Sequence, residues 1–290
     1  MRLTEATLNF ALHLIIMIKK IILPLFIILI LISCNNTTTE TSTTSNDSGS
    51  NNGPAAISFS VVNAYPHDTT SFTEGFLVHD GQLYESTGHT DDVPSSRSLF
   101  GTVDLKTGKI IPKVEIGNKY FGEGITFLKG KVYEMTLDAP RVCFVYDART
   151  YKKLGEYPLN SEGWGMTTDG IYLIRSDGSS NLSYHDPDNF RLVKVLGVTD
   201  NNGSVSNINE LEYINGFIYA NQWQTNYILK IDTSSGKVVG RLDLSSLAME
   251  AKNKYPDSNT LNGIAYDSAT KKIYVTGKLW PNIYEIKFNN

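Results

Sequence analysis

The chain has 290 residues, and its 26 Lys and Arg against 30 Asp and Glu give a formal net charge of −4. Without an excess of basic residues, it lacks the charge that nucleic-acid binding requires. Its two cysteines, Cys34 and Cys143, are too few for a disulfide framework or a thiolate metal cluster. The apolar run around Cys143 indicates a buried side chain rather than a nucleophile.

The N-terminal segment is typical of a secretory signal. Lys19 and Lys20 precede an apolar stretch at residues 21–32, which is short for a bilayer-spanning helix. The stretch ends in Leu-Ile-Ser followed by Cys34, which resembles a bacterial lipoprotein processing box, where cleavage before the cysteine leaves its thiol available for a lipid. We therefore predict a signal peptide at residues 1–33 and a lipid anchor on Cys34, which would attach the protein to a membrane of the bacterial cell envelope, on its periplasmic or outer-surface side.

Two features of this segment have alternative interpretations. Met17 stands directly before Ile18 and the two lysines, so a start at Met17 would give a more compact signal. An uncleaved anchor helix beginning near Ala11 is the other reading, but the lysines would interrupt it.

The next segment, residues 34–56, consists almost wholly of small and polar residues. It cannot bury enough apolar surface to offset the entropy of ordering, so we predict a flexible tether. The remaining residues 57–290 suffice for one large all-β domain.

One phrase recurs five times along this domain: a turn, an apolar residue and a tyrosine. Four copies are followed by a second hairpin with an Asp-containing turn. The successive tyrosines are 49, 39, 47 and 55 residues apart, at Tyr84, Tyr133, Tyr172, Tyr219 and Tyr274. Four short strands per 40 to 50 residues is the length of a propeller blade, so we predict an all-β, five-bladed β-propeller.

The last copy lacks an outer strand, whereas residues 57–62 form an unassigned strand pattern at the start. We therefore predict that the N-terminal strand closes the last blade, which protects edges that would otherwise pair with other chains. One helix is predicted, at residues 244–254.

Residues just before each apolar-Tyr phrase face the channel in a propeller, and here they carry carboxylates, aromatic residues and glycines. The motifs are FTEG at 72–75, FGEG at 121–124, EGWG at 162–165, NELE at 209–212 and LNGI at 261–264. Further along the blades stand Asn221-Gln222-Trp223 and Thr276-Gly277-Lys278-Leu279-Trp280.

In this order and spacing, the motifs resemble those of the plant and bacterial glutamine cyclotransferase family, over residues 57–288. The resemblance implies a five-bladed propeller that converts the N-terminal Gln of peptides and proteins to pyroglutamate with release of ammonia, without a catalytic metal or other cofactor. It assigns proton transfer to Glu123. The matching substrate-binding positions are Phe72, Phe121, Trp164, Asn209, Trp223 and Lys278.

Two positions depart from the family pattern. Glu74 replaces the usual Gln of the first motif and adds a second carboxylate to the predicted substrate-binding site. Leu137 stands where the family tends to have Trp. Both substitutions bear on substrate preference and rate.

The chemistry asks for these residue types. An α-amine with a pKa of about 8 is partly neutral near pH 7 and can attack the γ-carbonyl of its own residue, but the amide nitrogen leaves only if it is protonated. One carboxyl that accepts the amine proton and returns it to the leaving ammonia serves both steps. Aromatic walls would exclude water and raise the pKa of Glu123, and Asn209 and Lys278 would hydrogen-bond the developing oxyanion or the following peptide carbonyl.

Other interpretations stay open from the residues alone. A glutamate beside glycines often accepts hydrogen bonds from neighbouring backbone, and Asn209, Glu210 and Glu212 suit either that role or a structural divalent cation. Glu74 and Leu137 also fit a non-catalytic propeller that binds peptides or a cell-surface partner. A metal-dependent propeller lactonase or esterase is the third hypothesis, although the histidines are irregularly spaced and predict no zinc site.

Overall fold

Each repeat folds into antiparallel strands because its turns have the conformation that tight hairpins need. Asp80 and Gly81 both have positive φ, 48° and 70°, in the two-residue turn that joins the first two strands of a blade. The computed structural model describes residues 53–288. The predicted signal peptide, the alternative start at Met17 and the lipid site Cys34 lie outside the described residues.

Five such sheets form the blades, and each contains four antiparallel strands. The first contains β3 (Thr73–His79), β4 (Gln82–Thr87), β5 (Leu99–Asp104) and β6 (Lys109–Glu115). The second contains β7 (Gly122–Leu128), β8 (Lys131–Thr136), β9 (Val142–Asp147) and β10 (Lys153–Pro158). The third contains β11 (Met166–Thr168), β12 (Leu173–Arg175), β13 (Asn181–His185) and β14 (Leu192–Gly197).

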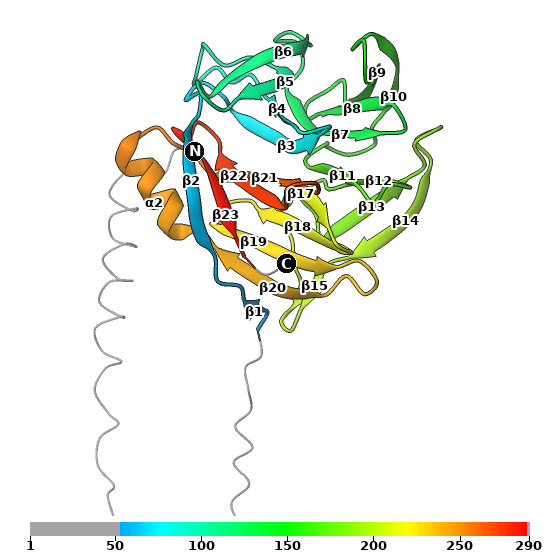
Figure 1. Cartoon of the computed structure of the whole chain (residues 1–290). Helices are drawn as coiled ribbons and strands as arrows, with labels where there is room; N and C mark the ends of the chain where they lie inside the picture. Colours follow the sequence, from blue (N-terminus) through cyan, green and yellow to red (C-terminus); the bar gives the residue numbers. More distant parts are fainter. Residues whose placement is uncertain (1–52, 289–290) are drawn as a thin grey trace, which may run out of the picture. The chain divides into compact units, whose positions relative to one another are not determined.

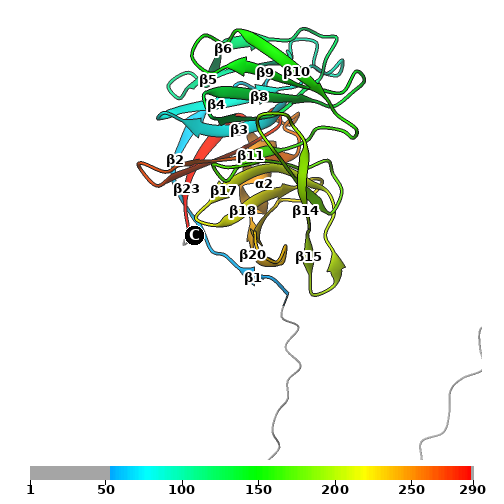
Figure 2. The ribbon, with the colours of Figure 1, turned by 90° about the vertical axis from the view of Figure 1, so that its right-hand side faces the viewer.

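The last two blades follow a short hairpin, β15 (Thr199–Asp200) and β16 (Gly203–Ser204). The fourth contains β17 (Ile208–Ile214), β18 (Phe217–Gln222), β19 (Tyr227–Asp232) and β20 (Val238–Asp243). The fifth contains β21 (Leu261–Asp267), β22 (Lys272–Gly277), β23 (Asn282–Lys287) and β2 (Ser60–Pro66). Figure 1 shows the five blades around a common centre, and Figure 2 gives the side view. The predicted five-bladed β-propeller is therefore confirmed.

The innermost strands close the ring. β3 contacts β7, β7 contacts β11, β11 contacts β17, β17 contacts β21, and β21 contacts β3 again. Buried apolar side chains fill the space between blades, as Phe100, Ile125 and Phe144 do between the first and second. The start of each inner strand is thereby fixed beside the central channel.

The N-terminal strand completes the fifth blade, as the unpaired pattern predicts, although it begins three residues later than expected. β2 runs antiparallel to β23, from Ser60 opposite Lys287 to Pro66 opposite Asn282. A second, unpredicted strand, β1 (Ala55–Ala56), pairs in parallel with β20. The sheet structure thus begins at Ala55, ahead of residue 57, where the strand pattern placed the start of the domain.

The one helix predicted within the domain is present as α2 (Ser245–Lys254), between β20 and β21. Leu247 and Ala251 are its buried residues and pack in a cluster with Leu261 and Trp280 of the fifth blade. No helix within residues 53–288 is long and apolar enough to cross a bilayer.

Candidate active site

A cavity of about 460 Å³ opens at the end of the channel where the inner strands begin. All eight residues predicted to form the catalytic and substrate-binding site line it, although five different blades supply them. They are Glu123, Phe72, Glu74, Phe121, Trp164, Asn209, Trp223 and Lys278. Leu137 also lines this cavity, together with Thr90, Gln224, Asn259 and Thr260, which sequence motifs did not single out.

Four polar side chains of the site region occupy the same place in their blades. Glu74, Glu123, Asn209 and Asn262 are each the second residue of an inner strand. At each of them the pairing with the next strand changes register. Such a bulge removes a residue from the ladder and redirects its side chain. All four side chains are buried, so the bulges bring polar groups together at the end of the channel.

Glu123 is a buried carboxyl whose Oε2 has no hydrogen-bond partner among residues 53–288. Burial raises its pKa well above the ordinary value, and the negative charge of Glu74 raises it further, while Lys278 acts in the opposite direction. Glu123 therefore keeps its proton to higher pH than an exposed glutamate and is able to donate it.

The sequence left open that Glu123 accepts hydrogen bonds from the neighbouring backbone. In the structure, Glu210 has this role. Its two oxygens accept hydrogen bonds from the backbone N–H groups of Phe76 and Ile264, at 3.2 and 2.8 Å. Glu212 accepts another from Tyr266 at 2.8 Å. These carboxyls join the inner strands of neighbouring blades. Within the described residues, no cluster of three or more His, Cys, Asp or Glu side chains is arranged to hold a metal ion.

Glu74 forms a buried ion pair with Lys278, with 2.7 Å between Oε1 and Nζ. Its Oε2 accepts a hydrogen bond from Nδ2 of Asn262 at 3.2 Å. Burial raises the pKa of Glu74 to about 7 even though Lys278 favours the ionised form. The lysine ammonium also lies 4.7 Å from the centre of the Phe72 ring, a cation–π arrangement. The pair therefore holds Lys278 against one wall of the cavity.

Two perpendicular aromatic pairs form the apolar walls. The ring centres of Phe72 and Phe121 are 5.9 Å apart, and those of Trp164 and Trp223 are 5.5 Å apart. Trp164 donates from Nε1 to Glu162 at 3.1 Å, which fixes the orientation of its indole. The sides of the cavity are therefore apolar and its buried end is polar.

Asn209 supplies the second unsatisfied polar atom of the cavity. Its Oδ1 is buried and, within the described residues, has no hydrogen-bond partner. A buried polar atom without a partner costs about 1–3 kcal/mol of stability, so two of them in one cavity are a sign of a bound ligand's position. Oδ1 of Asn209 and Oε2 of Glu123 are the atoms that a substrate would satisfy.

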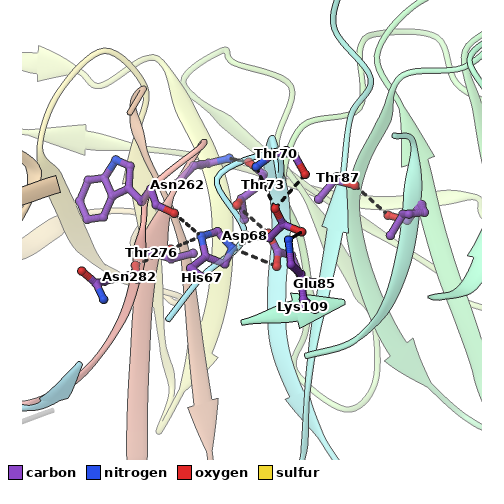
Figure 3. Close-up of polar contacts among 12 residues, drawn as sticks. His67, Asp68, Thr70, Thr73, Glu85, Thr87, Lys109, Asn262, Thr276 and Asn282 are labelled. Carbon is purple, nitrogen blue, oxygen red and sulfur yellow. Dashed lines mark hydrogen bonds and ion pairs between the residues drawn. The ribbon is translucent and has the colours of Figure 1, made fainter. Parts of the chain in front are cut away.

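A buried histidine between the first and fifth blades supports the Glu74 side of the site (Figure 3). In His67, Nδ1 lies 2.8 Å from the Trp280 carbonyl oxygen and Nε2 lies 3.1 Å from each oxygen of Glu85. Burial alone would lower the pKa of His67, but the Glu85 carboxylate outweighs this effect and the pKa is raised. Glu85 also accepts from the hydroxyl of Thr73, the residue before Glu74. The sequence motifs did not reveal this network, because His67 lies in no repeated motif and its pairing with Glu85 depends on how the chain folds.

The cavity has aromatic walls, a protonatable carboxyl and a buried ion pair, and it lies at the hub of a closed ring. These features define a β-propeller enzyme site for acid/base chemistry on a small polar group. Residues 28–288 match the profile of a family described as glutamine cyclotransferase. The chain is 38% identical over 230 residues to glutaminyl-peptide cyclotransferase of Arabidopsis thaliana. The aligned region covers 78% of this chain and 70% of the relative. The crystal structure of Myxococcus xanthus glutaminyl cyclase has a TM-score of 0.74 and 33% identity, and the match covers 81% of this chain and 98% of that one. The chain belongs to the glutamine cyclotransferase family.

Proposed function

We propose that this protein is a glutaminyl-peptide cyclotransferase, an acyltransferase that converts the N-terminal Gln of peptides and proteins to pyroglutamate and releases ammonia. The observation that carries the mechanism is the unpartnered, buried carboxyl of Glu123 in an aromatic-walled cavity. Membership of the family, with relatives named for this reaction, supports the same function.

The reaction needs two proton transfers around one carbon. The neutral α-amine attacks the γ-carbonyl carbon of Gln, a nitrogen–carbon bond forms, and the amine must lose a proton. The carbon–nitrogen bond of the side-chain amide then breaks, and ammonia leaves with one additional proton. Glu123 gives its proton to the amide nitrogen and accepts the amine proton, so it ends in its starting state. General acid/base help of this kind accelerates a reaction by about 10² to 10⁴.

Neighbouring residues hold the substrate for these transfers. Asn209 offers its amide N–H to the oxygen that becomes negative and its free Oδ1 to the attacking amine. Lys278, fixed by Glu74, adds positive charge beside the same oxygen or the following peptide carbonyl. The aromatic pairs confine the flexible Gln side chain, which increases the fraction curled toward its own amine. This chemistry needs no metal ion, because the amine is already partly neutral near pH 7.

The test compares two buried glutamates of the second blade. Glu123→Gln should lower the rate of ammonia release from a Gln-initiated peptide by about 10² or more, because the amide cannot donate and accept the proton. Glu134, on the adjacent strand β8, is equally buried. Its Oε2 accepts a hydrogen bond from Tyr146 at 2.9 Å and its Oε1, like Oε2 of Glu123, has no partner among residues 53–288, but Glu134 does not line the cavity. Glu134→Gln should therefore leave turnover close to that of the unaltered protein.

The readout is the loss of the mass of ammonia from the peptide, with free ammonia measured in parallel. Absence of turnover in the unaltered protein, combined with tight peptide binding that Glu123→Gln leaves unchanged, would favour the non-catalytic peptide-binding propeller instead.

We also propose that the protein is a lipoprotein of the bacterial cell envelope, anchored through Cys34 after removal of residues 1–33. The basic and apolar segment and its terminal cysteine support this assignment. In cells fed a labelled fatty acid, the full chain should take up label and fractionate with membranes. Cys34→Ser should abolish both, whereas Cys143→Ser should abolish neither, since Cys143 is buried in the domain. A labelled Cys34→Ser protein would contradict the proposal.

A further inference from the structure

A second cavity, of about 410 Å³, adjoins the active-site cavity. The two share Thr90, Phe121 and Leu137 as lining residues. The rest of the second cavity comes from the loop after β4 and from the loops on either side of the paired strands β7 and β8. It is lined in addition by His89, Asp91, Asp92, Asn118, Lys119, Tyr120 and Asp138.

The two unpartnered atoms at the buried end, on Glu123 and Asn209, fix which way a peptide enters. The reacting amine and amide of the terminal Gln must reach these atoms, so the rest of the peptide must leave the active-site cavity at its open side. One way out passes Thr90 and Leu137 into the second cavity. The other passes Gln224, Asn259 and Thr260, all uncharged side chains.

The charge of the second cavity is predominantly negative. Asp91, Asp92 and Asp138 are exposed, and none of them forms an ion pair with a lysine or arginine of residues 53–288. We refer to these three carboxylates as the acidic lip. Asp138 is near enough for its charge to raise the pKa of Glu123.

The basic side chains of this cavity, Lys119 and His89, offset the negative charge of the acidic lip only in part. The ammonium of Lys119 lies 5.2 Å from the centre of the Tyr120 ring. The His89 ring contacts the Ser96 carbonyl oxygen through Nδ1 at 2.9 Å, and its Nε2 is 3.7 Å from Asp91. A cationic side chain that enters the cavity therefore meets three carboxylates and one lysine.

We propose that the second cavity is the binding site for the residue that follows the N-terminal Gln, and that its acidic lip selects peptides with Lys or Arg at that position. This inference rests on the proposed cyclotransferase function and names the class of substrate. The lip attracts the cationic side chain through solvent-exposed charges, and such charges act mainly on association and on specificity.

The experiment measures kcat/KM for three tetrapeptides that begin Gln-Lys, Gln-Ala and Gln-Glu and are otherwise identical. We expect the order Lys, then Ala, then Glu, with roughly a 10-fold difference between the extremes at low salt. The difference should shrink toward unity at about 1 M salt, because exposed charges are screened.

A triple variant, Asp91→Asn, Asp92→Asn and Asp138→Asn, should bring the three kcat/KM values together without abolishing turnover of the Gln-Ala peptide. A matched control removes the same charge elsewhere, by Asp80→Asn, Asp188→Asn and Asp200→Asn, at positions that do not line either cavity. The control should keep the order and the ratio of the unaltered protein.

Binding provides a second readout that does not depend on turnover. The Glu123→Gln variant should bind the three peptides in the same order by calorimetry. Equal values for all three peptides, or a preference that survives in the lip variant, would overturn the inference while leaving the cyclotransferase function standing. Failure of all three peptides to release ammonia would instead contradict the proposed function.

Discussion

Two buried glutamates on inner strands, Glu123 and Glu210, differ in what surrounds their oxygens. Glu210 is satisfied by two backbone N–H groups, whereas Oε2 of Glu123 faces the cavity without a partner in the described domain. The two glutamates occupy different positions, since Glu123 is the second residue of β7 and Glu210 the third residue of β17. The difference in role therefore arises from the side-chain direction that the bulge in each strand imposes.

The negative charge of Glu74 raises the pKa of Glu123, so the rate should depend on pH in a way that Glu74 changes. The rate should rise with pH as the substrate amine loses its proton and fall as Glu123 loses its own. Glu74→Gln removes a negative charge that raises the pKa of Glu123 and frees Lys278, whose charge lowers it. Both changes act in the same direction, so the falling limb should move to lower pH.

The measurement is the pH profile of kcat/KM for the unaltered protein and the variant on one Gln-Ala peptide. The rising limb of kcat/KM belongs to the free substrate and should stay where it is, which makes it an internal control. A falling limb that does not move, or that moves to higher pH, would show that Glu74 does not act on Glu123 through its charge.

At the scale of strands and loops, glycines set the positions of the aromatic walls. Gly88 follows β4, and a Cβ atom there would overlap the ring of Phe121. Gly178 has a φ of +77°, and a Cβ atom there would come within 2.7 Å of the Trp164 ring. Each wall is therefore placed by a glycine on an adjoining segment that leaves room for the ring.

Gly88→Ala should displace Phe121 and lower kcat/KM by roughly 10- to 100-fold, because a misplaced wall loosens the curled geometry of the substrate. Gly155→Ala is the matched control, since Gly155 lies on the outer strand β10 and a Cβ there has no heavy atom within 4 Å. Thermal unfolding of both variants would separate loss of activity from loss of folding. Full activity in Gly88→Ala would contradict this role for the glycine.

The repeats along the chain were sufficient to predict the blades and the closing strand, and the resemblance of the motifs to a known family predicted the residues that meet in the cavity. The inner-strand motifs occupy the same place in each repeat, so closing the ring is enough to bring them together at one end of the channel. What the sequence did not reveal depends on contacts between blades. Lys278 and Glu74 are 204 positions apart, and the motifs predict that both face the channel but not that they pair. The His67–Glu85 pair and the strand β1 have no repeated pattern at all.

For the molecule as a whole, closure depends on a strand from the other end of the chain. A protein that begins at Gly53 should fold and turn over substrate like the longer chain. One that begins at His67 lacks β2, leaves the edge of β23 unpaired and removes the hydrogen bond from the Tyr65 hydroxyl to Glu285, at 2.8 Å. It should lose its cooperative thermal transition and aggregate, because an unpaired edge pairs with other chains.

A third chain, beginning at Phe59, separates the two N-terminal strands. It keeps β2 and removes β1 together with Ile57, whose N–H donates to the Arg241 carbonyl oxygen at 2.9 Å and whose side chain packs against the core of the fourth and fifth blades. Calorimetry should show a small loss of stability with the transition preserved. A cooperative, active protein that begins at His67 would contradict the assigned importance of β2.

Closure by β2 has a consequence for synthesis. Asn63 donates a hydrogen bond to Glu285, 222 positions later, so the two halves of the fifth blade meet only after nearly the whole domain has emerged from the ribosome. Contacts of such separation slow folding. A nonsense mutation anywhere before β23 would leave the ring open and the active-site cavity incomplete. The truncated product should therefore be inactive.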